Sequence, residues 1–362
     1  MELFDRLADD GHEEVVFCHD EATGLRAIIA VHSTRLGPAL GGVRFRPYDS
    51  EDEALADVLA LSRAMTYKAA VAGLDLGGGK AVILGDPARI KTEALLQAYA
   101  RHVDGLGGRY LTAEDVGTTQ ADMDLMRRET RYVTGTSRSL GGSGDPSAAT
   151  ALGVLQAMLA LATDLWGSPS LRGRRVVVSG VGKVGLTLAR HLVDEGAVVV
   201  ASDVDSAAIG RATRTLGLPS TPPERAHTVE CDIFSPCALG AVLTPARIPE
   251  LRCQAIVGAA NNQLAESRSV RLLSDAGIAY VPDFVANAGG IINIAHELVG
   301  YRLDRAHAAV RTIFETTMAV LTEATATGAS TTEVAEEMAR RRLTGYGRPG
   351  PAQAPRATVT GG

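Results

Sequence analysis

The feature that most constrains the fold is a glycine-rich turn between an apolar strand and a helix. Residues Arg175–Ser179 read as a strand, the next six residues are G-V-G-K-V-G, and a helical pattern continues to Glu195. A second apolar strand, Ala197–Ser202, ends at Asp203, which lies 203 − 180 = 23 positions beyond the first glycine. This strand, turn, helix and second strand with its terminal acid together indicate a Rossmann-type dinucleotide-binding domain.

The residues of this turn are the expected cofactor site. The glycines let the helix N-terminus meet a pyrophosphate. Asp203 is expected to bind the adenosine ribose hydroxyls and to repel a 2′-phosphate, which favours NAD over NADP. The predicted cofactor-binding residues of this fingerprint are Gly180, Val181, Gly182, Lys183, Val184, Gly185 and Asp203.

The chain has 362 residues, which is too long for one typical domain and suggests two. Composition shifts at Ser139–Pro146, S-L-G-G-S-G-D-P, and Ser147 can cap the long helix that follows, so the boundary is placed there. The predicted architecture is α/β, with a cleft between two domains. It comprises a substrate-binding and oligomerisation domain over 1–140, a dinucleotide-binding domain over 145–330, a helix over about 331–342 that packs back, and a disordered tail over 345–362.

Two lysines, Lys68 and Lys80, flank the glycines Gly77–Gly79. The segment before them reads as an amphipathic helix capped by Ser50, so Lys68 is expected near its C-terminus, where the helix dipole favours a cation. Lys80 opens the apolar run Ala81–Leu84, which suits a buried strand. Burial and a second positive charge both disfavour a protonated lysine, which makes Lys80 a candidate base. The alternative is that both lysines are solvated surface charges.

Other candidates lie at loops and strand ends. The stretch Gly37–Gly42 has too many glycines for a regular element and is expected to be a loop that wraps a ligand with backbone groups. Glu114 and Asp115 follow a short strand, Tyr110–Ala113, and acidic residues at a strand end within reach of a lysine are functional candidates. Asn262 and Asn287 follow later strands, whose carboxyl ends bind ligands in such sheets. The alternative for the acidic strand end is an ordinary surface carboxylate. The alternative for Asn262 and Asn287 is that they only cap loops.

Composition excludes several classes of function. A net charge of −6 argues against nucleic acid or an anionic membrane as the main partner. The four cysteines show no C-x-x-C spacing, so neither a metal site nor a disulfide framework is indicated. The N-terminus is acidic and lacks the apolar region of a signal peptide, and no apolar run is expected to approach the roughly 18 residues of a membrane span. We therefore expect a soluble, cytoplasmic protein.

Seven motifs occur in order along the chain. They are G-P-A-L-G-G from Gly37, M-T-Y-K from Met65, G-G-G-K from Gly77, T-A-E-D-V-G-T from Thr112, C-D-I-F-S-P-C-A-L-G from Cys231, G-A-A-N-N-Q-L from Gly258 and N-A-G-G from Asn287. With these motifs the sequence resembles the leucine, valine and phenylalanine dehydrogenases of the glutamate dehydrogenase superfamily. The resemblance extends from about Val15 to Met338.

The resemblance implies a role for each matching residue. Lys80 is the catalytic lysine, Asp115 is its acid–base partner, and Lys68 binds the substrate α-carboxylate. Thr150 contacts the nicotinamide amide, and Asn262 serves both the amino acid and the cofactor. The remaining implied substrate-binding residues are Gly41 and Gly42, with Leu40, Ala113, Ile291 and Ile294 against the substrate side chain.

The function implied is NAD-dependent, reversible oxidative deamination of valine, leucine or isoleucine to the 2-oxo acid, ammonium and NADH. Phenylalanine is the alternative substrate. A non-catalytic dinucleotide-binding sensor on the same fold is the alternative from another class, although a sensor has no need of an acid–base pair. The family also implies a homo-oligomer, and the sequence does not choose between dimer and octamer.

Overall fold

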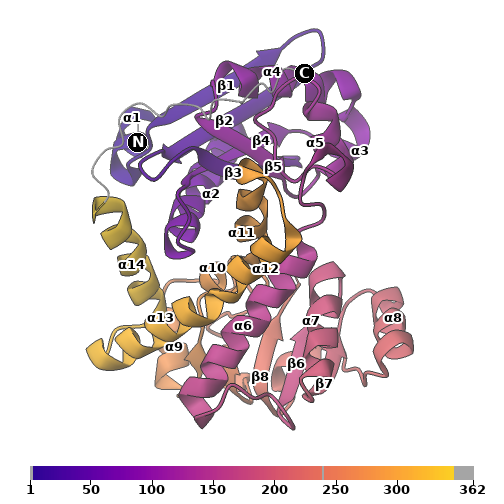
Figure 1. Ribbon diagram of the computed structural model, residues 1–362, viewed down its shortest axis with the longest axis vertical. Coiled ribbons are helices and arrows are strands. Elements are labelled where there is room, and N and C mark those ends of the chain that lie inside the picture. Colours follow the sequence, from indigo (N-terminus) through magenta and orange to yellow (C-terminus); the bar gives the residue numbers. More distant parts are fainter. Residues whose placement is uncertain (1–2, 239, 346–362) are drawn as a thin grey trace, which may run out of the picture. The chain divides into compact units, whose positions relative to one another are not determined.

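The computed structural model describes residues 3–238 and 240–345, and these form two compact units. Unit 1 contains the chain up to Gly144 together with the residues from Ala339 onward, and unit 2 runs from Asp145 to Met338. Each unit has its own five-stranded sheet (Figure 1). The predicted tail over 345–362 lies, apart from Gly345, outside the described residues.

Unit 1 is built on a mixed sheet with the strand order β1-β2-β4-β3-β5. β2 pairs antiparallel with β1 and β4, whereas β3 pairs parallel with β4 and β5. The strands are β1 (Glu14–Asp20), β2 (Leu25–Ser33), β3 (Ala39–Arg46), β4 (Gly77–Leu84) and β5 (Tyr110–Glu114). The helices are α1 (Leu3–Asp10), α2 (Glu51–Val71), α3 (Pro87–Ile90), α4 (Glu93–Gly105), α5 (Gln120–Met126) and the 3-10 turn η1 (Arg138–Leu140).

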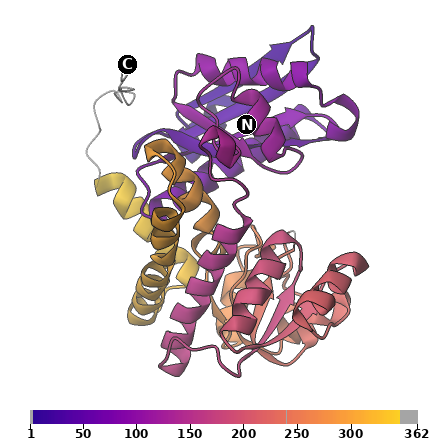
Figure 2. The same cartoon turned by 45° about the vertical axis from the view of Figure 1, so that its right-hand side comes forward.

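Helices cover both faces of this sheet, and side-chain alternation decides which strand residues each helix meets. In β2, Ala27, Ile29 and Val31 share a core with α4, while Ile28 and Ala30 between them pack with α2. Figures 1 and 2 show α2 and α4 on opposite sides of the sheet. β2 is therefore apolar on both faces, as expected for a strand buried on both sides.

Two strand boundaries differ from the sequence-based expectation. The loop expected over Gly37–Gly42 is wrong, because β3 starts at Ala39 and includes both final glycines. β4 starts at Gly77, so Lys80 lies inside the strand and does not open it. The reason is tertiary: a Cβ at Gly78 would overlap the backbone of Thr66 in α2. Close packing overrides the low strand propensity of glycine here.

Unit 2 is built on an all-parallel sheet with the order β10-β9-β8-β6-β7. The strands are β6 (Arg175–Ser179), β7 (Val198–Ser202), β8 (Cys231–Pro236), β9 (Cys253–Ile256) and β10 (Ala279–Tyr280). β6 matches its predicted bounds, and β7 follows it on one side while β8 lies on the other. The order of strands therefore reverses beside β6, which is where such sheets bind ligands. The predicted α/β class with a Rossmann-type second domain is confirmed.

The helices of unit 2 surround this sheet. They are α6 (Ser147–Trp166), α7 (Lys183–Asp194), α8 (Ser206–Leu216), α9 (Ser269–Asp275), α10 (Asp283–Ala286), α11 (Gly289–Ala295), α12 (Leu303–Arg311) and α13 (Ile313–Thr327), with the 3-10 turns η2 (Pro223–Thr228), η3 (Ile248–Glu250) and η4 (His296–Val299). The expected helical stretch from Ile291 to Thr325 is thus divided into shorter segments. One break falls at Gly300, whose φ of 84° suits glycine.

α6 is long and apolar enough to cross a membrane, which contradicts the expectation that no such run exists. However, 61% of its most apolar window is buried, and it packs on α7, α11 and α13 (Figure 1). It is therefore a core helix of unit 2. Ser147 is its first helical residue and not its cap, because the Asp145 carboxylate accepts the Ser147 backbone N–H.

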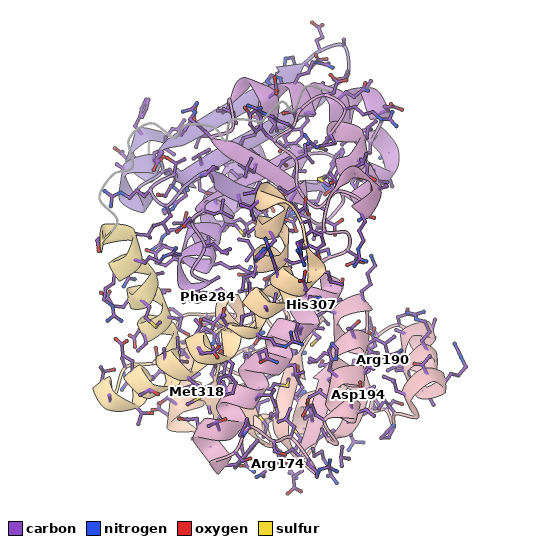
Figure 3. The ribbon with its side chains drawn as sticks, in the orientation of Figure 1. Arg174, Arg190, Asp194, Phe284, His307 and Met318 are labelled. Carbon is purple, nitrogen blue, oxygen red and sulfur yellow. The ribbon has the colours of Figure 1, made fainter. Side chains whose placement is uncertain are left out.

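Arg174 links the C-terminal end of α6 to the sheet of unit 2. It precedes β6 at the lower end of unit 2 in Figure 3, and its guanidinium lies 3.8 Å from the centre of the Trp166 ring. The same group pairs with Asp232 of β8 at 3.1 Å. One cation thus joins the last residue of α6 to two neighbouring strands.

The last helix, α14 (Thr331–Gly345), begins in unit 2, and its final residues are grouped with unit 1. Arg342 donates to the carbonyl oxygens of Ala70 and Leu74 at 3.1 and 2.7 Å and pairs with Asp75 at 2.8 Å. Ala70 lies in the last turn of α2 and Leu74 lies three residues beyond its end, where the helix dipole favours a cation. Arg342 therefore caps the helix that carries Lys68.

Candidate active site

Lys80 and Asp115 form a buried ion pair in unit 1. Lys80 Nζ lies 2.6 Å from Asp115 Oδ2, and only 9% and 19% of the two side chains are exposed. A lysine and a carboxylate in such close contact, with little access to solvent, are suited to proton transfer. The structure thus brings together the two residues to which the family resemblance gives the chemistry.

The strand register explains why the two side chains meet. β3 lies between β4 and β5, and Gly42 of β3 is directly opposite Ala113. The pairing of β3 with β4 puts Gly42 beside Lys80 on the other side. A Cβ at Gly42 would lie 2.5 Å from the carbonyl oxygen of Glu114 and 2.9 Å from Asp115 Cβ. Glycine is therefore required here, and it leaves the sheet face beside the ion pair without a side chain.

Two cations hold Asp115 in its charged form. Burial alone would raise the pKa of the Asp115 carboxyl group, but the Lys80 ammonium and then the Arg44 guanidinium lower that pKa below its ordinary value. Arg44 Nε lies 3.4 Å from Asp115 Oδ2. Asp115 is therefore a carboxylate at neutral pH. The sequence motifs did not indicate Arg44, because its partners come from other elements.

Lys68 is positioned by the helix that covers this face. The Ser50 hydroxyl accepts the Glu53 backbone N–H at the start of α2, as predicted, and Lys68 lies in the last turn. Thr66, which is fully buried, packs directly on Gly78 of β4. Lys68 is two residues beyond Thr66 and Lys80 is two residues beyond Gly78. The backbones that carry the two lysines therefore approach each other.

Tyr110 supports the glycines of the site from the opposite side of the sheet. Its hydroxyl donates to the Gly41 carbonyl oxygen at 2.6 Å, and the ring is fully buried against Gly79. Burial raises the pKa of Tyr110 well above its ordinary value, so the phenol remains a donor. The sequence analysis did not identify this residue.

Tyr110→Phe is expected to lower the free energy of unfolding, because it leaves the buried Gly41 carbonyl without its donor. The expected loss is about 1–3 kcal/mol. Denaturant unfolding measures it. Tyr132→Phe is the control, because the one hydrogen bond of the Tyr132 hydroxyl within the described residues is an exposed one donated by Arg131. Equal stability of Tyr110→Phe and the wild type would contradict this role.

In unit 2 the three glycines of the fingerprint have different surroundings. Gly180 has a φ of +103°, and a Cβ there would lie 2.5 Å from the backbone nitrogen of Ala238. A Cβ at Gly185 would overlap the Gly180 carbonyl, whereas one at Gly182 would meet nothing within 4 Å. The first glycine thus makes the turn, the third brings helix and strand together, and the second leaves open space at the N-terminus of α7. This space fits the pyrophosphate of a dinucleotide.

Asp203 has a second role that the sequence did not reveal. Its Oδ2 accepts the backbone N–H of Val181 at 2.7 Å, and its Oδ1 accepts that of Asp205 at 2.9 Å. The carboxylate expected to bind the ribose therefore also fixes the glycine turn. Lys183, the first residue of α7, pairs with Asp145 at 2.8 Å, and Val184 follows it in the same turn.

The other predicted residues of unit 2 lie near the start of α6, between β9 and α9, and before or within α11. The Thr150 hydroxyl donates to the Pro146 carbonyl at 3.1 Å. Asn262 is exposed in a left-handed conformation with a φ of 53°. The Asn287 amide donates to the side-chain oxygen of Asn261 at 2.8 Å. The aliphatic side chains Ile291 and Ile294 are 6% and 9% exposed.

Comparison with known proteins identifies the family. Residues 12–132 match the model of the Glu/Leu/Phe/Val dehydrogenase dimerisation domain, and residues 141–213 and 213–340 match that of the glutamate/leucine/phenylalanine/valine dehydrogenases. The chain belongs to the Glu/Leu/Phe/Val dehydrogenase family. This confirms the resemblance predicted from the motifs. The family uses NAD or NADP, in agreement with the fingerprint of unit 2.

Individual members of the Glu/Leu/Phe/Val dehydrogenase family match over nearly the whole chain. A leucine dehydrogenase of Geobacillus stearothermophilus is 49% identical over 95% of this chain and 94% of its own length. A valine dehydrogenase of Streptomyces virginiae is 52% identical over 92% of this chain and 94% of its own length. The crystal structure of L-tryptophan dehydrogenase from Nostoc punctiforme superposes with a TM-score of 0.84, at 40% identity over 95% of this chain and 99% of that one.

Proposed function

We propose that this chain catalyses the reversible, NAD-dependent oxidative deamination of branched-chain L-amino acids. The products are the 2-oxo acid, ammonium and NADH. The observation that carries the proposal is the buried Lys80–Asp115 pair beside the side-chain-free position Gly42. Its support comes from relatives at 49% and 52% identity that are named leucine and valine dehydrogenases.

Lys80 and Asp115 are proposed to perform the proton transfers. NAD, when bound, accepts the hydride from the substrate α-carbon, which becomes an electrophilic iminium carbon. Lys80 first passes its proton to Asp115 and then, in its neutral form, takes a proton from the water that attacks this carbon. Asp115 gives the proton it received to the departing amine. The separation of 2.6 Å between the two groups allows a proton to pass directly between them.

Lys68, at the end of α2, is proposed to bind the substrate α-carboxylate as a compact positive charge. The backbone of Gly41 and Gly42, together with Asn262, is proposed to complete the amino acid site. Thr150 is proposed to contact the nicotinamide amide, and the fingerprint residues of unit 2 to bind the rest of the dinucleotide.

Four aliphatic residues are proposed to contact the substrate side chain: Leu40, Ala113, Ile291 and Ile294. None of them is cationic, so a second carboxylate would be buried without a partner, and glutamate should be a poor substrate. Isoleucine is bulkier than valine at these positions, so we propose that the pocket favours a short branched chain and accepts valine at least as well as leucine. A methylene changes the transition-state energy by only about 1–3 kcal/mol in such a pocket, so the preference should be graded.

The ranking of substrates tests this part of the proposal. We expect kcat/KM to be highest for valine and leucine, lower for phenylalanine and lowest for glutamate. Ala113→Gly removes a methyl group from the pocket, and Ile291→Leu keeps the volume but moves the branch away from the backbone. We therefore expect the double variant to move preference toward phenylalanine. A wild type that clearly prefers phenylalanine would show that the pocket assignment is wrong, while the roles of Lys80 and Asp115 would be unaffected.

NAD is the proposed cofactor because Asp203 ends the second strand of the fingerprint and would repel the 2′-phosphate of NADP. We expect kcat/KM with NAD to exceed that with NADP, as measured by initial rates at fixed amino acid concentration. Equal or better use of NADP would refute the assignment. Asp203→Asn is the informative variant: it removes the charge and keeps an oxygen for the Val181 N–H, although it loses the acceptor of the Asp205 N–H.

The protein is proposed to be a cytoplasmic homo-oligomer. Residues 12–132 match a domain described as a dimerisation domain, which supports self-association through unit 1. The free cysteines Cys18, Cys231, Cys237 and Cys253 suit a reducing compartment. Light scattering would distinguish a dimer from an octamer.

A further inference from the structure

One guanidinium contacts both the proposed catalytic acid and the helix that covers the site. Arg44 Nη1 lies 3.0 and 3.2 Å from the two carboxylate oxygens of Asp57 in α2. Its Nε lies 3.4 Å from Asp115 Oδ2 at the end of β5. The three side chains are 19–21% exposed, so these contacts are largely shielded from solvent and salt.

The position of Arg44 follows from the sheet register. β3 is paired with β5 as far as Val43 opposite Glu114. Arg44 is therefore level with Asp115, and it is two residues beyond Gly42, on the same face of the sheet. Gly42 leaves space beside Lys80, and the side chain of Arg44 occupies the next position on the same face of β3. Arginine is suited to this position because its planar fork can bind two carboxylates in different directions.

Asp57 links this contact to Lys68. The two residues are 68 − 57 = 11 positions apart in α2. At about 3.6 residues per turn this separation is close to three full turns, so both side chains leave the helix on the same side. Asp57 is itself fixed, because the Tyr48 hydroxyl donates to its Oδ2 at 2.8 Å. A cation anchored to Asp57 therefore restrains the rotation of α2 about its axis.

We propose that Arg44 is a positioning residue for the deamination reaction: it holds the Asp115 carboxylate against Lys80 and, through Asp57, fixes the helix that presents Lys68. This inference rests on the proposed function. It assigns Arg44 and Asp57 an indirect role, in which both act on the reacting groups through other residues.

The charges around Asp115 make this role measurable by pH. Within unit 1, Asp115 interacts with Lys80 of β4, Arg44 of β3 and the phenol of Tyr110 in β5. Behind Arg44 lie Asp57 of α2 and its partners Tyr48 and Arg46, with Arg46 3.9 Å from Asp57. Removing the positive charge of Arg44 should raise the pKa of Asp115. Removing the negative charge of Asp57 should lower that pKa, because Asp57 then no longer offsets the positive charge of Arg44.

Three substitutions test the proposal in the full-length enzyme. Arg44→Lys keeps the charge but loses the fork, so kcat for leucine should fall about tenfold to a hundredfold with an unchanged pH profile. Arg44→Gln should lower kcat further and move the acid limb of the profile to higher pH. Asp57→Asn should also lower kcat, but should move that limb to lower pH. A purely structural defect would not give shifts of opposite sign.

Arg46→Lys is the matched control. Arg46 lies on the same strand and face, and pairs with Glu53 of the same helix at 3.0 Å, but it has no contact with Asp115 among the described residues. It should retain the kcat and pH profile of the wild type. If Arg44→Lys and Asp57→Asn behave like Arg46→Lys, or if both charge changes move the acid limb in the same direction, the proposal is overturned.

An inactive wild type would refute the proposed function and, with it, the catalytic role of Arg44, but not the contact of Arg44 with Asp57 and Asp115. The contact would then be tested by stability. Arg44→Gln and Asp115→Asn should shift the unfolding midpoint less in combination than the sum of their separate shifts, because residues in contact are not additive. Additive shifts would overturn the proposed contact.

Discussion

Lys80→Ala is expected to lower kcat by about 10²–10⁴-fold, because this is the usual contribution of a positioned general base. KM for the amino acid should change much less, since Lys80 is assigned to the activation of water and not to holding the carboxylate. Initial rates of NADH formation at saturating leucine and valine measure the change. A thermal melt of the variant checks its folding, because Arg44 is then the one cation that pairs with Asp115 in the part of the chain that the structure describes.

Lys91→Ala provides the matched control for this experiment. Lys91 pairs with Asp122 at 2.8 Å and is partly buried, so its removal also breaks a lysine–aspartate pair in unit 1. Its effect on kcat should be far smaller than that of Lys80→Ala. If Lys80→Ala changed only KM, or if both variants lost activity equally, the assignment of Lys80 to the chemistry would be wrong.

Lys68→Ala is expected to raise KM for the amino acid about tenfold to a hundredfold, because a hydrogen bond to a charged group contributes about 1.5–3 kcal/mol. kcat at saturating substrate should fall less. KM for NAD should be unchanged, because the dinucleotide fingerprint lies in unit 2. Comparing KM for NAD with KM for the amino acid in the same variant therefore serves as an internal control. Lys68→Arg retains the positive charge and should recover part of the lost affinity.

A Lys68→Ala variant with a normal KM and a low kcat would contradict this division of labour between the two lysines. That result would mean that Lys68 contributes mainly to the transition state, since an interaction made only there lowers kcat without changing substrate binding. Arg342 caps the helix on which Lys68 lies. KM for the amino acid in an Arg342 variant therefore measures how much this cap contributes to substrate binding.

The parts of the fold that the sequence predicted are those with strong local signals. β6 has three consecutive buried valines and is followed by a glycine with a positive φ, and its bounds were predicted correctly. The start of α2 was predicted from Ser50, whose cap depends only on neighbouring residues. By contrast, the loop expected at Gly37–Gly42 is a strand, because packing against neighbouring backbone determines its conformation and local propensity does not.

The candidate site was predicted in a similar way. Lys68, Lys80 and Asp115 lie in recognisable motifs, and the contact between the last two is present in the structure. Arg44 and Tyr110 were missed, because their contacts join segments that are far apart in the sequence. For Tyr110 the partner is Gly41, which lies 69 residues away. The hydrogen bonds of Asp203 to the glycine turn were missed for the same reason.

The most direct test of the proposed function is the stoichiometry of the reaction catalysed by the wild-type protein. With leucine or valine and NAD, NADH and ammonium should appear in equal amounts, and the Lys80→Ala variant should form neither at a comparable rate. Binding of NAD without formation of NADH from either amino acid would contradict the proposal and would favour a non-catalytic dinucleotide sensor.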